Sequence, residues 1–271
     1  MHQQLCRRGR NAQTRWPAPR SVAACTLLLC AAPLSLAGRP LSSDDASTAD
    51  AGTCQLEAWS SRDTGKASGT SGTSGTSGTR ARSVIVAPAC GLAAGLELGA
   101  DHTRFSPRGT QPEQGGLALK WVPAAWQVSS AAGELNFGLK LSGGWVKAAG
   151  AGWQGAQTDA LLLATLKATE TLAVHANLGA ARDRAQRTQA ALLNLALVWT
   201  PLDALLLFAE VQGNDKPAVF GRQVFSVGTR WWLVKDTLGV DLSASREAGN
   251  GIGSGSGKRW TFGLGWYGIG A

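Results

Sequence analysis

The chain has 271 residues, and its 16% of charged residues lies well below the roughly 25% of ordinary soluble domains. Large apolar residues recur along most of the chain, which excludes disorder throughout. Beyond the N-terminal region the longest unbroken apolar stretch is Ala204–Ala209, far short of the ~20 residues of a membrane-spanning helix. A soluble β-rich domain or an outer-membrane β-barrel remains.

Residues 1–37 have the organisation of a secretory signal peptide. Five arginines and no acidic residue precede the apolar run Val22–Ala32, and the small residues of Ser35–Ala37 follow. We therefore predict that the signal peptide is cleaved after Ala37. One alternative is an apolar helix of the mature protein. Another is a lipid on Cys25, but the lipoprotein-like box lies in front of the apolar run instead of behind it.

Loss of this signal changes both the charge and the cysteine content. The formal net charge falls from +8 to +3, because five arginines and no acids leave, so no basic stripe remains and we expect no nucleic-acid partner. Cys54 and Cys90 remain, which favours one disulfide in an exported protein. Neither belongs to a Cys-x-x-Cys pair, and the sequence predicts no metal site and no cofactor.

The rest of the chain alternates apolar and polar residues. Residues 38–52 are small and polar and are predicted to form a flexible lead, whereas residues 53–271 have the period of two that is typical of strands. In Glu134–Ser142 one face carries Glu, Asn, Gly, Lys and Ser and the other only Leu and Phe. Twelve segments have this character: 53–63, 81–90, 92–105, 114–126, 133–146, 158–168, 170–182, 188–200, 203–213, 222–235, 237–248 and 258–270.

The connections between these segments separate a membrane barrel from a soluble sheet, since both alternate. Short links such as 201–203 and 235–237 alternate with generally longer ones such as 106–113 and 214–221. Up-and-down outer-membrane barrels have short periplasmic turns and long outside loops. We therefore predict an all-β fold, a 12-stranded antiparallel up-and-down transmembrane β-barrel. The Ser-Gly-Thr repeats of residues 68–79 fall in an outside loop as a solvated spacer.

Tryptophans gather near the ends of the predicted strands. Interfacial aromatic girdles are typical of membrane barrels, and core tryptophans of a β-sandwich are the alternative. The candidates for a girdle are Trp121, Trp126, Trp199, Trp231, Trp232 and Trp266 at one end and Trp145 and Trp260 at the other.

The two remaining cysteines lie at the open end of the first predicted hairpin. Cys54 begins its first strand and Cys90 ends its second, so the two residues face each other if the strands are antiparallel. We predict a Cys54–Cys90 disulfide that closes this hairpin, with two unpaired thiols as the alternative.

Several short motifs resemble those of a known family. Cys54–Trp59, Val174–Gly179, Ala209–Gly213, Val227–Trp232 and Val240–Ser243 look like the MetA-pathway of phenol degradation family. These proteins are outer-membrane transporter barrels of Gram-negative bacteria, and the resemblance runs over most of residues 53–270. It implies the cell outer membrane as the location and transport of small molecules as the activity.

The alternation also predicts which polar side chains point into the lumen. They carry both signs, so they either form ion pairs that fill the lumen or build a polar constriction that selects a solute. Arg230 lies on a strand adjacent to those of Glu210 and Asp241. The predicted inward positions are Glu57, Glu97, Lys120, Glu134, Asn136, Lys140, Lys167, His175, Asn177, Glu210, Arg230 and Asp241.

Three functions fit this interpretation. The first is a transporter or narrow pore for small molecules, hydrophobic or aromatic ones among them, with outer-membrane lipid, lipopolysaccharide, the barrel-assembly machinery and the solute as partners. The second is an outer-membrane enzyme of the lipid-hydrolase type. His102 and His175 are the only histidines beyond the signal, and neither lies in the His-x-Ser-Asn-Gly pattern of such an enzyme. We therefore assign no catalytic residue. The third is a structural barrel with a plugged lumen.

Overall fold

The computed structural model describes residues 41–64, 82–93, 95–106, 112–148, 150–217, 223–248 and 257–270. Residues 34–271 form one compact unit. The predicted signal peptide (residues 1–37) and the predicted spacer of residues 68–79 lie outside the described residues. No helix of the described ranges is long and apolar enough to cross a membrane.

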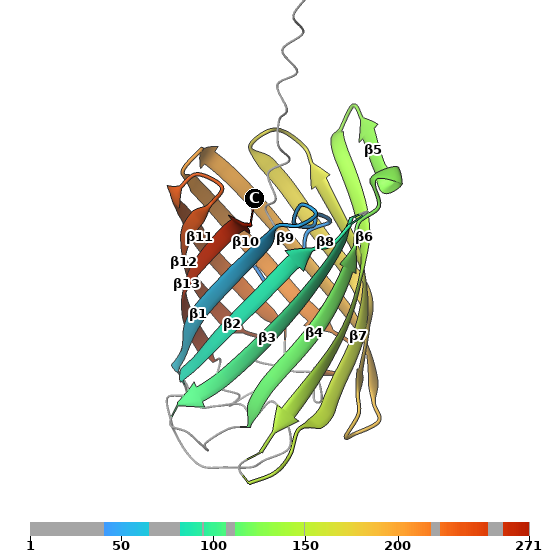
Figure 1. The fold of residues 1–271 in the computed structure, drawn as a ribbon, viewed down its shortest axis with the longest axis vertical. Coiled ribbons are helices and arrows are strands. Elements are labelled where there is room, and N and C mark those ends of the chain that lie inside the picture. The colour runs from blue at the N-terminus through green and yellow to red at the C-terminus, as the bar shows by residue number, and fades with distance from the viewer. Residues whose placement is uncertain are drawn as a thin grey trace, which may run out of the picture. The chain divides into compact units, whose positions relative to one another are not determined.

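The described residues form one antiparallel sheet of thirteen strands (Figure 1). The strands are β1 (Cys54–Thr64), β2 (Arg82–Gly91), β3 (Leu96–Ser106), β4 (Glu113–Trp121), β5 (Gln127–Ser130), β6 (Gly133–Lys147), β7 (Gln154–Lys167), β8 (Leu172–Asp183), β9 (Gln189–Leu202), β10 (Leu205–Asn214), β11 (Val224–Val234), β12 (Leu238–Glu247) and β13 (Lys258–Ile269).

The sheet closes on itself. β1 pairs with β13 along almost its whole length, and β4 pairs with β6, so that β5 stands outside the ring and pairs only with the first residues of β6. The ring therefore has twelve strands, and closure leaves none of their edges exposed. This confirms the predicted all-β, 12-stranded antiparallel up-and-down barrel.

One connection differs from the prediction. The sequence extended the fourth strand to Trp126, but β4 ends at Trp121 and a 3₁₀ turn, Ala124–Trp126, leads into β5. Pro123 explains the early end, because proline has no N–H to donate to a strand ladder. β5 and the start of β6 then form a small hairpin at the barrel rim.

The two ends of the barrel differ as the alternating connections predicted. One end, which we call the short-turn end, carries the tight turns between β7 and β8, between β9 and β10, and between β11 and β12. Here Lys235 Nζ donates to Asp203 Oδ2 at 2.8 Å and links two of these turns. The hydrogen bond and the positive charge of Lys235 lower the pKa of the Asp203 carboxyl.

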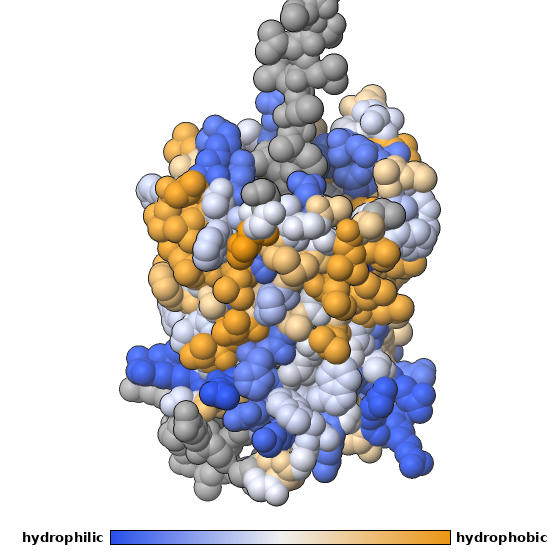
Figure 2. Space-filling model, in the orientation of Figure 1, coloured by the Kyte–Doolittle hydropathy of each residue, from blue (hydrophilic) through white to orange (hydrophobic). Residues whose placement is uncertain are grey.

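The outer face of the barrel is apolar. Figure 2 shows hydrophobic residues gathered across the middle of one face, with hydrophilic residues towards both ends. Many large apolar side chains on this face are 37–64% exposed, a degree of apolar exposure that a water-soluble surface avoids. Among them are seven of the eight tryptophans predicted for the girdles: Trp121, Trp126, Trp145, Trp199, Trp231, Trp260 and Trp266.

Trp232 is the exception, and its placement in the girdle was wrong. Its side chain is buried, and its ring packs edge-on against that of Tyr267, with the centroids 5.4 Å apart. Consecutive residues of a strand point to opposite faces, so Trp231 and Trp232 cannot both face outward.

Glycines on the inner face make room for aromatic rings on the neighbouring positions. A Cβ at Gly265 would lie 2.5 Å from Tyr267 Oη, and a Cβ at Gly228 would lie 2.5 Å from Phe208 Cε1. The rings thus cover bare stretches of backbone inside the barrel, an arrangement that supports strongly curved sheets.

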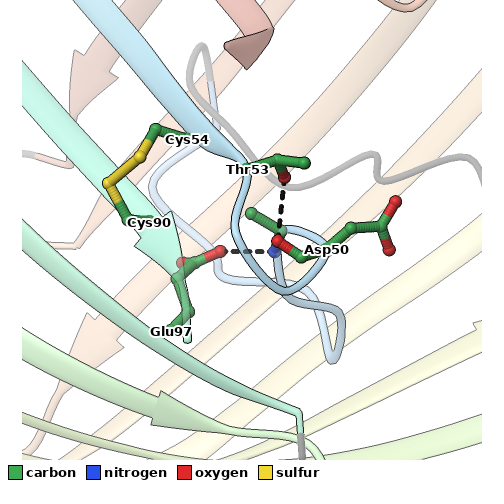
Figure 3. The surroundings of a disulfide bond; sticks show 6 residues. Asp50, Thr53, Cys54, Cys90 and Glu97 are labelled. Atoms are coloured by element: carbon green, nitrogen blue, oxygen red, sulfur yellow. Dashed lines mark hydrogen bonds between the residues drawn. A yellow bond between two sulfur atoms is a disulfide. The ribbon is translucent and has the colours of Figure 1, made fainter. Parts of the chain in front are cut away.

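The disulfide prediction is confirmed. Cys54 and Cys90 face each other in the β1–β2 register and are bonded (Figure 3). The bond joins residues 36 positions apart and closes the hairpin at the short-turn end.

We expect the double variant Cys54→Ser, Cys90→Ser to unfold more easily by ~4 kcal/mol, because the cross-link restricts the unfolded chain over its long loop. Urea unfolding of the protein in lipid vesicles, followed by tryptophan fluorescence, measures the change. Reduction of the wild-type protein is the control and should give the same loss. Equal free energies of unfolding for variant and wild type would contradict this account.

Candidate functional site in the barrel lumen

The inside of the barrel is partly filled by its own chain. Residues 41–51, which we call the lumen segment, belong to the stretch predicted as a flexible lead (residues 38–52), and in the structure they lie against the inner face of the wall. Leu41, Ser43, Asp45 and Ala46 are buried, and their contacts are with inward-facing residues of opposite walls. Small polar composition fits a solvated coil and a narrow lumen equally well, so composition alone could not separate them.

Wall side chains bind the backbone of the lumen segment. The Glu210 carboxylate accepts hydrogen bonds from the backbone N–H groups of Ser42, at 3.0 Å, and Ser43, and a further one from Ser43 Oγ at 2.8 Å. Asn177 forms a pair of bonds with Asp44: the Asp44 N–H donates to Asn177 Oδ1 at 2.8 Å, and Asn177 Nδ2 donates to the Asp44 carbonyl at 2.7 Å. A carboxylate and an amide buried in the lumen are thereby satisfied.

Two further wall residues continue this pattern towards the short-turn end. The Ala46 N–H donates to Thr165 Oγ1, and the Ala49 N–H donates to Glu97 Oε2, both at 2.8 Å. Figure 3 shows Glu97 beside this part of the chain and close to the disulfide that anchors β1. The segment is thus held along its length by side chains from β3, β7, β8 and β10.

The acidic side chains of the segment pair with lysines of the wall. Lys140 Nζ lies 2.7 Å from Asp44 Oδ2, and Lys120 Nζ lies 3.5 Å from both Asp45 Oδ1 and Glu97 Oε1. Lys120 is buried with its partners, and a buried charge of this kind is tolerable only when it is paired.

Apolar residues of the segment fit apolar patches of the wall. Leu41 packs with Val198, Leu206 and Phe208, and Ala46 packs with Leu161 and Leu163. The inner face is therefore not uniformly polar, because β7, β9 and β10 turn large apolar side chains inward where the segment covers them.

His175 lies beneath this segment with 1% of its surface exposed. Its Nδ1 is 2.9 Å from Thr165 Oγ1, and its Nε2 has no hydrogen-bond partner among the described residues. His102, the other candidate of a hydrolase, is half-exposed, receives a hydrogen bond from Arg104 and packs edge-on against Trp153. The two histidines therefore have separate surroundings, and neither hydrogen-bonds a serine in the part of the chain that the structure describes.

A second polar cluster lies across the seam where the barrel closes. Arg230 is 1% exposed and donates to Asp241 through Nε at 2.7 Å and Nη2 at 2.9 Å, and its Nη2 lies 3.4 Å from Glu57 Oε1. Tyr267 donates its hydroxyl to Glu57. The guanidinium carbon also lies 5.0 Å and 5.2 Å from the centres of the Tyr267 and Trp232 rings, a cation–π arrangement.

The structure brings most of the predicted inward residues into these two clusters. Arg230 and Asp241 pair as their neighbouring strands suggested, but Arg230 and Glu210 do not: Arg230 stands opposite Leu206 in the register, whereas Glu210 binds the lumen segment. Near the short-turn rim, Glu134 accepts from Asn136 at 2.8 Å and from Lys167 at 3.2 Å.

Sequence reasoning missed the partners that complete these clusters. Asp44 and Asp45 were assigned to the flexible lead, although two adjacent acids have a matching pair in Lys120 and Lys140. Tyr267 was missed as an inward residue, although an outward Trp266 places the next side chain on the inner face.

A cavity of about 370 Å³ adjoins the lumen segment on the side of β1–β4. Leu41–Asp44 form one of its walls, and Trp59, Glu57, Glu97, Lys120 and Lys140 line it together with smaller residues. The segment therefore narrows the lumen but leaves a space of molecular size beside it. No group of three or more potential metal ligands occurs among the described residues.

Two solved porin structures agree with this geometry at the level of fold. The NanC porin aligns with a TM-score of 0.55 at 7% identity, and the KdgM porin with 0.51 at 10%; each alignment covers 78% of this chain and 98% of the porin. The toluene transporter TodX of P. putida aligns with a TM-score of 0.47 at 8% identity over 80% of this chain and 90% of its own.

The fold is thus that of outer-membrane porin barrels. The chain belongs to the family described as uncharacterised conserved protein UCP029691, whose model matches residues 25–263. No curated protein matches the sequence.

We expect Arg230→Leu to destabilise the barrel by about 3–5 kcal/mol, because Asp241 and Glu57 would remain buried without their cation. Arg259→Leu is the matched control: Arg259 pairs with Asp63 at 2.6 Å, but both side chains are about half-exposed, so its loss should cost about 0–1 kcal/mol. Urea unfolding in vesicles compares the two. A loss for Arg230→Leu no larger than for Arg259→Leu would refute the structural role of this cluster.

Proposed function

We propose that the protein is an outer-membrane pore or transporter that passes small solutes through a narrow lumen. The single observation that carries this proposal is a closed barrel with an apolar outer face and a charged, partly hollow interior. Such a barrel satisfies every backbone group of its wall and offers a polar path across hydrocarbon. The likeness to porin folds supports the class.

The lumen segment sets the width of this path in the proposal. Glu210 of β10 and Asn177 of β8 contact it from one side, and Lys120 of β4 contacts it from the other. Solutes would therefore pass beside the segment, through the cavity of about 370 Å³, or after the segment has moved. A space of that volume suits small molecules and excludes folded polymers.

The location and processing of the chain follow from the same proposal. Cleavage of the signal after residue 37 would leave residues 38–40 in front of the lumen segment, so that its first end is free and its second joins β1. The short-turn end would face the periplasm, as in other barrels of this type, and the barrel-assembly machinery, lipid and lipopolysaccharide would be partners in the outer membrane. The resemblance to the MetA-pathway transporters supports transport as the activity.

Removal of the lumen segment should widen the pore. We expect a variant without residues 41–51 to have a single-channel conductance roughly twofold higher or more, since the segment fills part of the lumen. Planar-bilayer recordings measure it. Deletion of the repeat at residues 68–79, placed by the sequence in an outside loop, is the control and should leave conductance unchanged.

A second variant covers the case in which the deletion variant fails to fold. A protease site inserted after Gly52, an exposed residue between the segment and β1, allows the segment to be cut after the barrel has formed. Cleavage followed by washing should raise the conductance as the deletion does. Equal conductance before and after verified loss of the segment would contradict its role in the pore.

A further inference from the structure

The contacts of the lumen segment are mainly contacts with its backbone. Glu210, Asn177, Thr165 and Glu97 accept five backbone N–H groups between positions 42 and 49, and Asn177 also donates to a backbone carbonyl. Every peptide presents these groups, so a peptide of different sequence that bends as the segment does at Ser42, Ser43 and Ala46 would find the same partners. The wall therefore binds backbone groups that any polypeptide carries.

The two lysines add a preference for charge. Lys120 and Lys140 stand directly opposite each other in the β4–β6 register, where like charges repel. Asp44 and Asp45 lie against them and remove this repulsion. Without the segment Lys120 would keep Glu97, but Lys140 would lose the one ion-pair partner it has among the described residues. The site thus favours two adjacent acidic residues.

The apolar patches define the flanking positions. Leu41 occupies the patch of Val198, Leu206 and Phe208 three residues before the first acid, and Ala46 fits against Leu161 and Leu163 directly after the second. The bound pattern is therefore one large apolar residue, two small ones, two acids and one small residue.

From these contacts we propose that the lumen is a binding site for short acidic peptides, and that the lumen segment occupies it as a tethered ligand. This deepens the proposed pore function and rests on it for transport, since it names the solute class; binding itself does not depend on conduction. An acidic peptide of the stated pattern would replace the segment and reform the same hydrogen bonds and ion pairs.

Binding is tested with a fluorescent peptide, Leu-Ser-Ser-Asp-Asp-Ala-Ser-Thr-Ala, added in detergent to the barrel whose segment has been cut at Gly52 and washed out. The deletion variant without residues 41–51 serves as an independent second preparation. We expect saturable binding by fluorescence anisotropy to both, and at least tenfold weaker binding to the uncut protein. An unrelated peptide with the same apolar–small–small–acid–acid–small pattern should also bind.

Matched peptides separate the two kinds of contact. A peptide carrying Asp44→Asn and Asp45→Asn should bind at least about tenfold more weakly, because it loses the charge-assisted bonds. A peptide N-methylated at positions 43 and 46 should lose as much affinity, because it loses buried hydrogen bonds. N-methylation at Thr48, whose N–H makes no hydrogen bond to any other described residue, is the control and should leave affinity unchanged. In the protein, Lys140→Gln should weaken binding of the acidic peptide and leave binding of its Asn form unchanged.

Several outcomes would overturn the inference. The first is an absence of saturable binding to either emptied barrel, and the second is equal affinity for the acidic and Asn peptides. The third is an equal loss of affinity for the peptide N-methylated at positions 43 and 46 and for the peptide N-methylated at position 48. Binding without any conductance in bilayers would instead refute the pore and leave the peptide site intact. Conductance without binding would refute the peptide site alone.

Discussion

Closure of the sheet between β1 and β13 is the constraint on which the rest of the structure depends. Every N–H and C=O of a barrel strand needs a partner on a neighbouring strand when apolar surroundings offer none. Twelve strands in a ring meet this need, and the ring forces alternate side chains into a confined interior. The charges inside must then find partners inside.

The interior meets this requirement in two different ways. At the seam, Glu57, Arg230, Asp241 and Tyr267 come from β1, β11, β12 and β13, so all partners are parts of the wall and the cluster also joins the closing strands. Across the lumen, Glu210, Asn177 and Lys140 have partners among residues 42–44, which precede the first strand. The cluster at the seam is therefore held by the barrel alone, whereas the cluster across the lumen also depends on a segment that is not one of its strands.

Much of this fold could be predicted from the sequence, and the reason is local. The period of two in segments such as Glu134–Ser142 fixes which side chains face outward, and Cys54 and Cys90 mark the ends of one hairpin. The inward placement of Arg230 and Asp241 follows from the same alternation, because neighbouring strands with tight turns have a nearly fixed register.

The part that could not be predicted is the part without periodicity. Residues 41–51 have no alternation, and their place depends on acceptors that lie far away in sequence, Glu210 being 167 residues from Ser43. The absence of a Glu210–Arg230 pair has the same origin: once the segment supplies backbone N–H groups to Glu210, that carboxylate needs no cation. Glu210 accepts from Gln212 of the wall but has no ion pair among the described residues, and Lys120 and Lys140 face each other. Inward charges that the wall itself does not balance are thus the sign of a bound chain, and they indicate which groups that chain must carry.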